Sequence, residues 1–457
     1  MNILALLQCL EPSLTGTTTR QLSGIIGAML VMSGRVTMQG IARWGGKGGS
    51  YRTVQRFFST VIPWGTLFWV FFREQLWQRG TTYLLAGDEV VVTKSGKRTH
   101  GLDRFFSSLY GKPIPGVSFF ALSLVSVEER HAYPISIEQI VRDEAEKAAS
   151  KIKATHRKKG ASKSKGSDKK QSKPGRPKGS KNKSKAEVVL SPELGRIQAL
   201  VKGLLQRLVG HLPLTYLVLD GHFGNNPALV MARTCGLQLI SKLRYDSELY
   251  LPYDGPYNGH GPRRKYGNKL VAHALPAEHL QKSVLKDIIK TDFYQMQLLH
   301  KKFSQTLNVV IIVKTNQTNG ACAHVCLFSS DLQLPYHQLV DYYSLRFQIE
   351  FNFRDAKQFW GLEDFMNIKA TAVTNAASLS LFMVNFAHCL LRTSRHTHHA
   401  DDCSVLDLKA FCRGFKYLQE TLKLLPQMPD PILFSQMLNH VTRLGRIHPV
   451  LTDSLAP

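Results

Sequence analysis

The chain has 457 residues, enough for two or three domains, and its 43% hydrophobic content is ordinary for a globular protein. Its charge is unusual, because 59 Lys and Arg against 33 Asp and Glu leave +26, which predicts a polyanionic partner. Seven scattered cysteines suit a reducing cytosol. No apolar run is expected to reach the length of a membrane span, so nucleic acid is favoured over a membrane surface as the partner.

Residues 1–78 are expected to form a helical N-terminal DNA-binding domain. The opening stretch, MNILALLQCLEP, has no basic region or cleavage site, so it is predicted to be the first helix and not a secretion signal. Residues 37–44, a glycine-rich turn and residues 50–58 have the outline of a helix-turn-helix. Arg52 and Arg56 lie four residues apart on the second helix, where they could reach phosphates or guanine edges. The alternative is an ordinary helical pair in an all-α domain.

From residue 82 the pattern changes to strands alternating with helices, which predicts an α/β domain over residues 79–365. Strands are expected at residues 84–92, 116–126, 131–137, 216–220, 237–241, 307–314 and 324–329, and a helix at 227–234. Residues 366–457 are expected to form a helical C-terminal region, with an apolar stretch at 376–392 that packs against the core.

Residues 151–185 interrupt this pattern with 15 Lys or Arg and a single acid, so this segment alone carries +14 of the net charge. It has too little apolar surface to fold and is predicted to be disordered when free. Around Arg176, the tripeptide Gly-Arg-Pro resembles the centre of an AT-hook, which places arginine in a narrow minor groove. A generic basic tether that binds any duplex is the favoured alternative.

Two aspartates lie in strands where packing does not account for them. Asp88 has Ala86 and Val90 as neighbours on its own strand face, and Asp220 ends a short buried strand. A charge on an apolar strand is costly unless a partner or a metal compensates it. Both residues are therefore better explained by function than by packing.

A third acid, Glu350, lies in a predicted helix among cations. At 100° per residue, Tyr343, Arg346, Glu350, Arg354 and Lys357 share a stripe about 80° wide, while apolar residues form the opposite side. One carboxylate among three cations suits a site where a divalent metal and a phosphate meet. The alternative is a solvated face with i,i+4 ion pairs.

The spacing Tyr343-x2-Arg346-x3-Glu350-x6-Lys357 resembles the Tyr-Arg-Glu-Lys signature of bacterial cut-and-paste insertion-sequence transposases. This resemblance implies an α/β fold with a ribonuclease-H-like catalytic core and a mostly β insertion, here expected at residues 245–305. It also implies that Asp88, Asp220 and Glu350 are the catalytic acids and that they bind two Mg²⁺ ions, for which Mn²⁺ can substitute.

The same resemblance implies that the cations bind DNA. Tyr343, Arg346 and Lys357 would hold phosphates of the cleaved end, with Arg354 assisting, and Lys94 follows the strand of the first acid. The expected partner is double-stranded DNA, both the terminal inverted repeats and the target, bound by a homodimer in the bacterial cytoplasm at the nucleoid. Two rival functions are a structure-selective nuclease and a domesticated DNA-binding protein without catalytic activity.

Several features depart from the family or compete with this interpretation. No tryptophan lies between Trp77 and Trp360 to stack a flipped base, so Tyr250, Tyr253, Tyr257 or a phenylalanine would have to replace it. Glu89 is a rival ligand, but strand alternation directs it to the face opposite Asp88. A zinc site at Cys322, His324 and Cys326 would need two more ligands. The His- and Asp-rich residues 396–403 favour a solvated loop.

Overall fold

The computed structural model describes residues 3–46, 49–107, 110–147, 185, 187–257, 259–271, 274–398 and 403–448. Arg176 and almost all of the basic segment 151–185 lie outside these residues.

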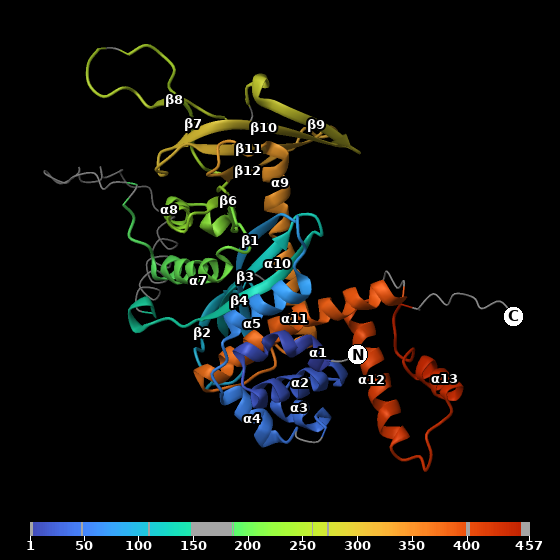
Figure 1. Cartoon of the computed structure of the whole chain (residues 1–457). Coiled ribbons are helices and arrows are strands. Elements are labelled where there is room, and N and C mark those ends of the chain that lie inside the picture. Colours follow the sequence, from blue (N-terminus) through green and yellow to red (C-terminus); the bar gives the residue numbers. More distant parts are fainter. Residues whose placement is uncertain are drawn as a thin grey trace, which may run out of the picture.

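The chain begins with helical elements that pack beneath the sheet (Figure 1): α1 (Ile3–Leu7), η1 (Gln8–Ser13), α2 (Gly16–Val31), α3 (Met38–Trp44), α4 (Tyr51–Ser59), α5 (Trp64–Phe71) and η2 (Phe72–Leu76). Thr37 and Ser50 cap α3 and α4 by accepting hydrogen bonds from backbone N–H groups, as polar N-caps do.

The described strands form one twelve-stranded mixed sheet. Its main path runs β2-β3-β1-β5-β6-β12-β11-β10-β7-β8, while β4 pairs with β3 and β9 with β10. The first half consists of β1 (Tyr83–Thr93), β2 (Asp103–Ser107), β3 (Lys112–Ser126), β4 (His131–Ile140), β5 (Tyr216–Val218) and β6 (Gln238–Lys242). Strands β1, β5 and β6 are parallel, whereas β3 runs antiparallel to β1. The fold is thus mixed α/β and consistent with the expected ribonuclease-H-like core.

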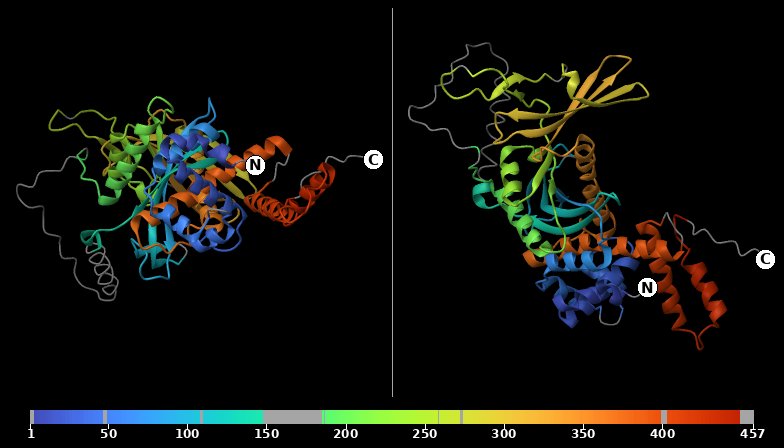
Figure 2. Two further views of the ribbon diagram at one scale, coloured as in Figure 1. Left: turned by 60° about the horizontal axis from the view of Figure 1, so that its bottom comes forward. Right: turned by 45° about the horizontal axis from the view of Figure 1, so that its top comes forward.

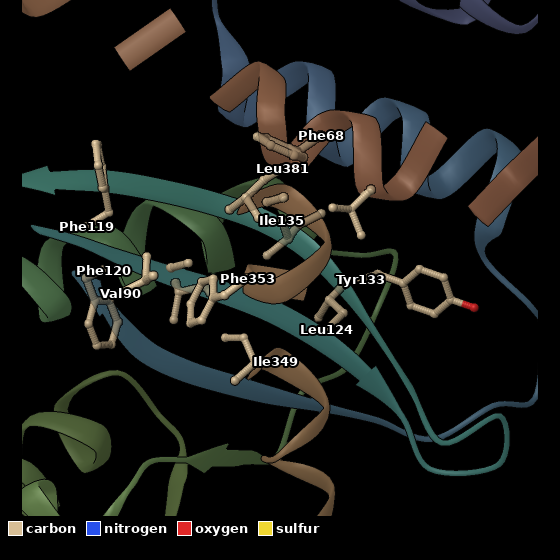
Figure 3. Close-up of a cluster of buried hydrophobic side chains, with 14 of the residues drawn as sticks. Phe68, Val90, Phe119, Phe120, Leu124, Tyr133, Ile135, Ile349, Phe353 and Leu381 are labelled. Carbon is tan, nitrogen blue, oxygen red and sulfur yellow. The ribbon is translucent and has the colours of Figure 1, made fainter. Parts of the chain in front are cut away.

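Helices cover both faces of the central strands, because alternate residues of β1 and β3 are apolar on each side. On one side lie α7 (Pro192–Leu208) and α8 (Asn226–Thr234), and on the other lies α9 (Tyr336–Leu345), which leads into α10 (Gln348–Trp360) (Figures 1 and 2). Leu339, Tyr342 and Leu345 of α9 belong to the same buried cluster as Ala86. Figure 3 shows Ile349 and Phe353 of α10 beside Val90 of β1. Helix α10 is therefore fixed over the strand face that carries Asp88.

The β-rich insertion extends the core sheet. It contains β7 (Leu249–Pro252), β8 (Tyr266–Lys269), η4 (Ala277–His279), β9 (Leu280–Lys286) and β10 (Ile289–His300), followed by β11 (Leu307–Asn316) and β12 (Cys322–Ser329). Strand β12 pairs with both β6 and β11, so hydrogen bonding continues from the core into the insertion. The eight segments predicted from the sequence, seven strands and one helix, are all present, with end shifts of a few residues.

Helix α11 (Ala370–His398) is a core helix that joins the N-terminal helices to the sheet. Its buried Asn375 accepts a hydrogen bond from Trp64 Nε1 (2.8 Å) and donates to the carbonyls of Phe58 (2.9 Å) and Thr60 (2.7 Å) at the end of α4. Residues Ala370–Thr393 are long and apolar enough to cross a membrane by length and composition, so the expectation that no apolar run reaches that length is wrong. In this structure 89% of the apolar window is buried inside the protein.

The last described helices, α12 (Val405–Leu422) and α13 (Pro431–Val441), extend to one side of the body (Figures 1 and 2). Lys409 and Arg413 of α12 donate to the carbonyls of Met29 and Val31 at the C-terminus of α2. Cations at this position complement the negative end of a helix dipole, and they attach the C-terminal region to the N-terminal helices.

Candidate active site

The pairing of β1 with β5 places the two aspartates side by side. The strands are parallel with Ala86 opposite Val218, so Asp88 and Asp220 each lie two residues beyond that pair at the same edge. Asp220 has left the strand and caps the short helix η3 (Gly221–Phe223), accepting the His222 N–H at 3.1 Å. The hydroxyl of Ser241 donates to the Asp220 carbonyl (2.6 Å) and secures this turn.

Close packing after Asp220 explains one of the glycines there. A Cβ on Gly224 would lie 2.1 Å from the Lys242 carbonyl oxygen, which no side chain tolerates. The loop therefore sits directly on the end of β6, and the position of Asp220 depends on that contact.

Arg346 links Glu350 to Asp88. The guanidinium contacts Asp88 Oδ2 through Nη1 at 2.7 Å and Glu350 Oε1 through Nη2 at 2.9 Å. The chain tightens at Arg346 and Phe347 between α9 and α10, where i+3 hydrogen bonds from Ile349 and Glu350 replace helical ones. The apolar residues on both sides of this turn still face the same way. Those predicted on the buried face are all buried: Leu345, Ile349, Ala356 and Trp360.

The electrostatics of Asp88 reflect burial beside other acids. Burial raises the pKa of Asp88 to about 6, and the negative charges of Asp220 and Glu350 add to this. Arg346 and the Glu89 N–H, which donates to Asp88 at 2.8 Å, act in the opposite direction. A cation bound here would therefore stabilise the ionised form of Asp88 and offset the charges of the two neighbouring acids.

The donors present fit a magnesium site. Mg²⁺ prefers oxygen ligands, and the three acids offer only carboxylates. Within the described ranges, no group of three His, Cys, Asp or Glu side chains is close enough to hold a metal ion. Instead the Arg346 guanidinium occupies the place between Asp88 and Glu350, so side chains must move before all three acids share an ion.

The other residues predicted on the helical stripe flank this centre. Tyr343 lies close enough to Arg346 and Asp220 to interact with both, and burial raises the pKa of its hydroxyl. Lys357 Nζ contacts the Val91 carbonyl (3.3 Å) and Glu363 (3.1 Å), and its side chain is 30% exposed. Arg354 is exposed and pairs with its neighbour Asp355.

Four residues predicted to bind DNA lie away from the acids or are not described. Arg52 and Arg56 are exposed on α4, in the helical part beneath the sheet (Figure 1). Lys94 is only 5% exposed, and its ammonium donates to the carbonyls of Glu363 (2.8 Å) and Phe365 (2.7 Å). A phosphate could reach this lysine only after these bonds broke, so DNA contact by Lys94 stays a prediction that requires a rearrangement. Arg176 lies outside the described residues.

Some features of the site escaped the sequence-based predictions. Phe347 and Phe351 flank Glu350 on α10 and are 50% and 37% exposed, with ring centroids 5.4 Å apart. Arg354 lies over the Phe351 ring at 4.8 Å. An exposed aromatic pair beside a cation suits an unstacked base, and the i,i+4 spacing of the two phenylalanines was visible in the sequence.

On the opposite face of β1, His222 lies 3.3 Å from Glu193 of α7. This hydrogen bond raises the pKa of His222. Glu89 also lies on this face, where it accepts a hydrogen bond from Ser118, as strand alternation predicts.

The tyrosines of the insertion are partly used in packing. Tyr250 is 9% exposed and contacts the Tyr266 ring at 5.5 Å, whereas Tyr257 is 54% exposed. Arg264 covers the Tyr253 ring at 4.9 Å. At the zinc candidate, the His324 Nε2 lies 3.2 Å from the Tyr245 carbonyl. Among the described residues, Cys322, His324 and Cys326 do not form a group that could hold a metal ion.

Comparison with known families adds an independent observation. The DDE superfamily endonuclease family matches residues 9–296. The chain belongs to this family. The matched part contains Asp88 and Asp220 and ends before Glu350, so the third acid rests on the geometry described above. No curated protein matches the chain. As a DDE endonuclease, the protein has DNA as its implied substrate, and domains of this family typically use divalent metals.

Proposed function

We propose that this DDE endonuclease is the transposase of an insertion sequence. It would bind the terminal inverted repeats, cleave DNA and join the freed 3′ ends to target DNA. The observation that carries the proposal is the meeting of Asp88 and Glu350 at the Arg346 guanidinium, next to the strand end that holds Asp220. An ordinary structural ion pair does not require a third acid at the same edge of the sheet.

Asp88, Asp220 and Glu350 are the residues that would hold divalent ions. Such ions lower the pKa of water and stabilise a leaving oxygen in phosphoryl transfer. Arg346, once released from the acids, would hold a phosphate of the cleaved strand, and Lys357 at 30% exposure lies on the same helix to hold another. Phe347 and Phe351 would accept bases that leave the stack near this phosphate.

The rest of the chain would supply the DNA-binding surface. Arg52 and Arg56 are exposed on α4, the second helix of the predicted helix-turn-helix, and would contact DNA from there. A net charge of +26 supports contact with a long stretch of DNA. Two copies of the chain would be needed to pair two ends, so we infer a homodimer in the complex, acting in the bacterial cytoplasm.

The test is a cleavage and joining assay with the conservative variants Asp88→Asn, Asp220→Asn and Glu350→Gln. Each variant is expected to lose Mg²⁺-dependent cleavage by at least about a thousandfold while it still binds DNA, since only acid ligands are removed. The substrate is DNA from either side of the gene that contains its inverted repeats, with a supercoiled plasmid as target.

The outcomes separate the rival functions. Cleavage without joining would identify a structure-selective nuclease, which the family description also allows. DNA binding with no cleavage by the wild type would identify a non-catalytic DNA-binding protein. Variants that cut as well as the wild type would refute the assignment of these three acids.

A further inference from the structure

A polar groove of about 510 Å³ opens at Gly224, four residues after Asp220, and its other lining residues have no role in the site described so far. Its walls are residues 224–227 at the start of α8, residues 244–248 after β6, and residues 300–303 after β10. The walls belong to the core and to the β-rich insertion, so the groove lies where these two parts meet.

The walls are held together by one buried side chain. Asn226 is 6% exposed, accepts the Ser304 N–H at 2.8 Å and donates to the Lys185 carbonyl at 2.9 Å. The amide oxygen of Asn226 thus joins α8 to the turn after β10, whereas its nitrogen bonds the backbone of Lys185. This buried contact fixes two walls of the groove relative to each other.

The charge of the groove is positive once its ion pairs are counted. Asp246 pairs with Arg244 at 3.0 Å, and Glu248 pairs with Lys269 at 2.7 Å, so both acids are neutralised. Lys301 and Lys302 are exposed and form no ion pair within the described part of the chain. Lys301 lies over the Tyr250 ring at 4.6 Å, which orients its ammonium without cancelling its charge.

His300 lies beside the two lysines, and its Nδ1 accepts the Lys302 backbone N–H at 3.1 Å. Burial is the largest cause that lowers the pKa of His300. The positive charges of Lys302 and Lys185 lower this pKa further, and Glu248 opposes them.

We propose that this groove, which we name the Lys301–Lys302 groove, binds the sugar–phosphate backbone of the DNA as it runs from the Asp220 side of the active site along the insertion. The inference rests on the proposed function and assigns a DNA-binding role to residues that no signature in the sequence indicated. Two lysines that form no ion pair with any described residue would recognise phosphates through charge, so the contact positions DNA without reading its sequence.

The experiment uses the full-length protein in EDTA, which prevents cleavage, and measures affinity for a fluorescent duplex by anisotropy over a series of salt concentrations. The double variant Lys301→Ala/Lys302→Ala is expected to bind about five- to tenfold more weakly at moderate salt. The slope of log K against log salt should become shallower by roughly 1 to 2, since each lost phosphate contact accounts for about 0.9. Lys301→Arg/Lys302→Arg should retain the wild-type slope.

The matched control is Lys282→Ala/Lys286→Ala, which removes the same charge from two exposed positions on β9 of the same insertion. This control is expected to change affinity by less than about twofold, because the two lysines lie outside the groove. Equal effects of both double alanine variants, or none in either, would overturn the proposed groove while leaving the function in place. A wild-type protein that binds no duplex at any salt concentration would overturn both.

Discussion

Replacing Asp88 by asparagine is expected to stabilise the metal-free protein even though it removes the first catalytic acid. The Asp88 side chain is only 19% exposed and lies near the acids Asp220 and Glu350. Its cationic partner is the Arg346 guanidinium. Asparagine keeps an oxygen for the Glu89 N–H but carries no charge. The substitution therefore removes the cost of ionising a buried carboxyl group.

The size of the effect follows from the pKa of about 6, against an ordinary value of 3.8. This difference corresponds to about 3 kcal/mol at pH values above 6, which is an upper bound. The amide loses part of the contact with Arg346, so we expect a gain of about 1–2 kcal/mol in the free energy of unfolding.

The pH dependence has a definite sign. The folded pKa of Asp88 lies above its unfolded value, so between about pH 4 and 6 the folded state binds more protons than the unfolded state. The contribution of Asp88 to stability therefore falls as pH rises through this window. Asp88→Asn should gain most over the wild type at pH 8 and nearly nothing at pH 4.

Urea denaturation in EDTA at pH 4.5, 6 and 8 would measure this difference, with Glu89→Gln as the control for removing one charge from the opposite face of the same strand. Saturating Mg²⁺ should reverse the order at pH 8, because the wild type gains more from binding the ion. An Asp88→Asn protein that is less stable than the wild type in EDTA at pH 8 would show that burial does not control the charge of Asp88.

Three further changes test other parts of the structure. Arg346→Met should lower the free energy of unfolding in EDTA by about 2 kcal/mol, because Asp88 loses its cation, and should increase the stabilisation by Mg²⁺ in thermal melts; an unchanged response to Mg²⁺ would mean that the guanidinium does not compete with the ion. Gly224→Ala would press a Cβ against the Lys242 carbonyl and shift the Asp220 loop, so cleavage should fall about a hundredfold; normal cleavage would contradict this. Asn375→Ala leaves the Trp64 N–H and two carbonyls at the end of α4 without their buried partner and should cost about 2–4 kcal/mol in urea denaturation, whereas a loss below about 1 kcal/mol would mean that water replaces the amide.

The sequence by itself determined the local structure and much of the candidate site. Strand alternation placed Asp88 and Glu89 on opposite faces, helical periodicity identified the buried side of α10, and Ser50 marked the start of α4. Each of these features depends on residues that are close in the sequence, within one helical turn or one strand. A single sequence is therefore enough to predict them. The same is true of the spacing between Arg346 and Glu350, which face one another at i,i+4.

Only the tertiary structure decided which side chains are free to act. From the sequence alone Lys94 would be taken for an exposed cation. In the fold it is buried, and it donates hydrogen bonds to the carbonyls of Glu363 and Phe365, about 270 residues away. The Lys301–Lys302 groove forms where three segments meet, and the place of Arg346 between two acids depends on the packing of α10 against β1. Contacts between distant segments set burial and charge at these positions, and no local pattern encodes them.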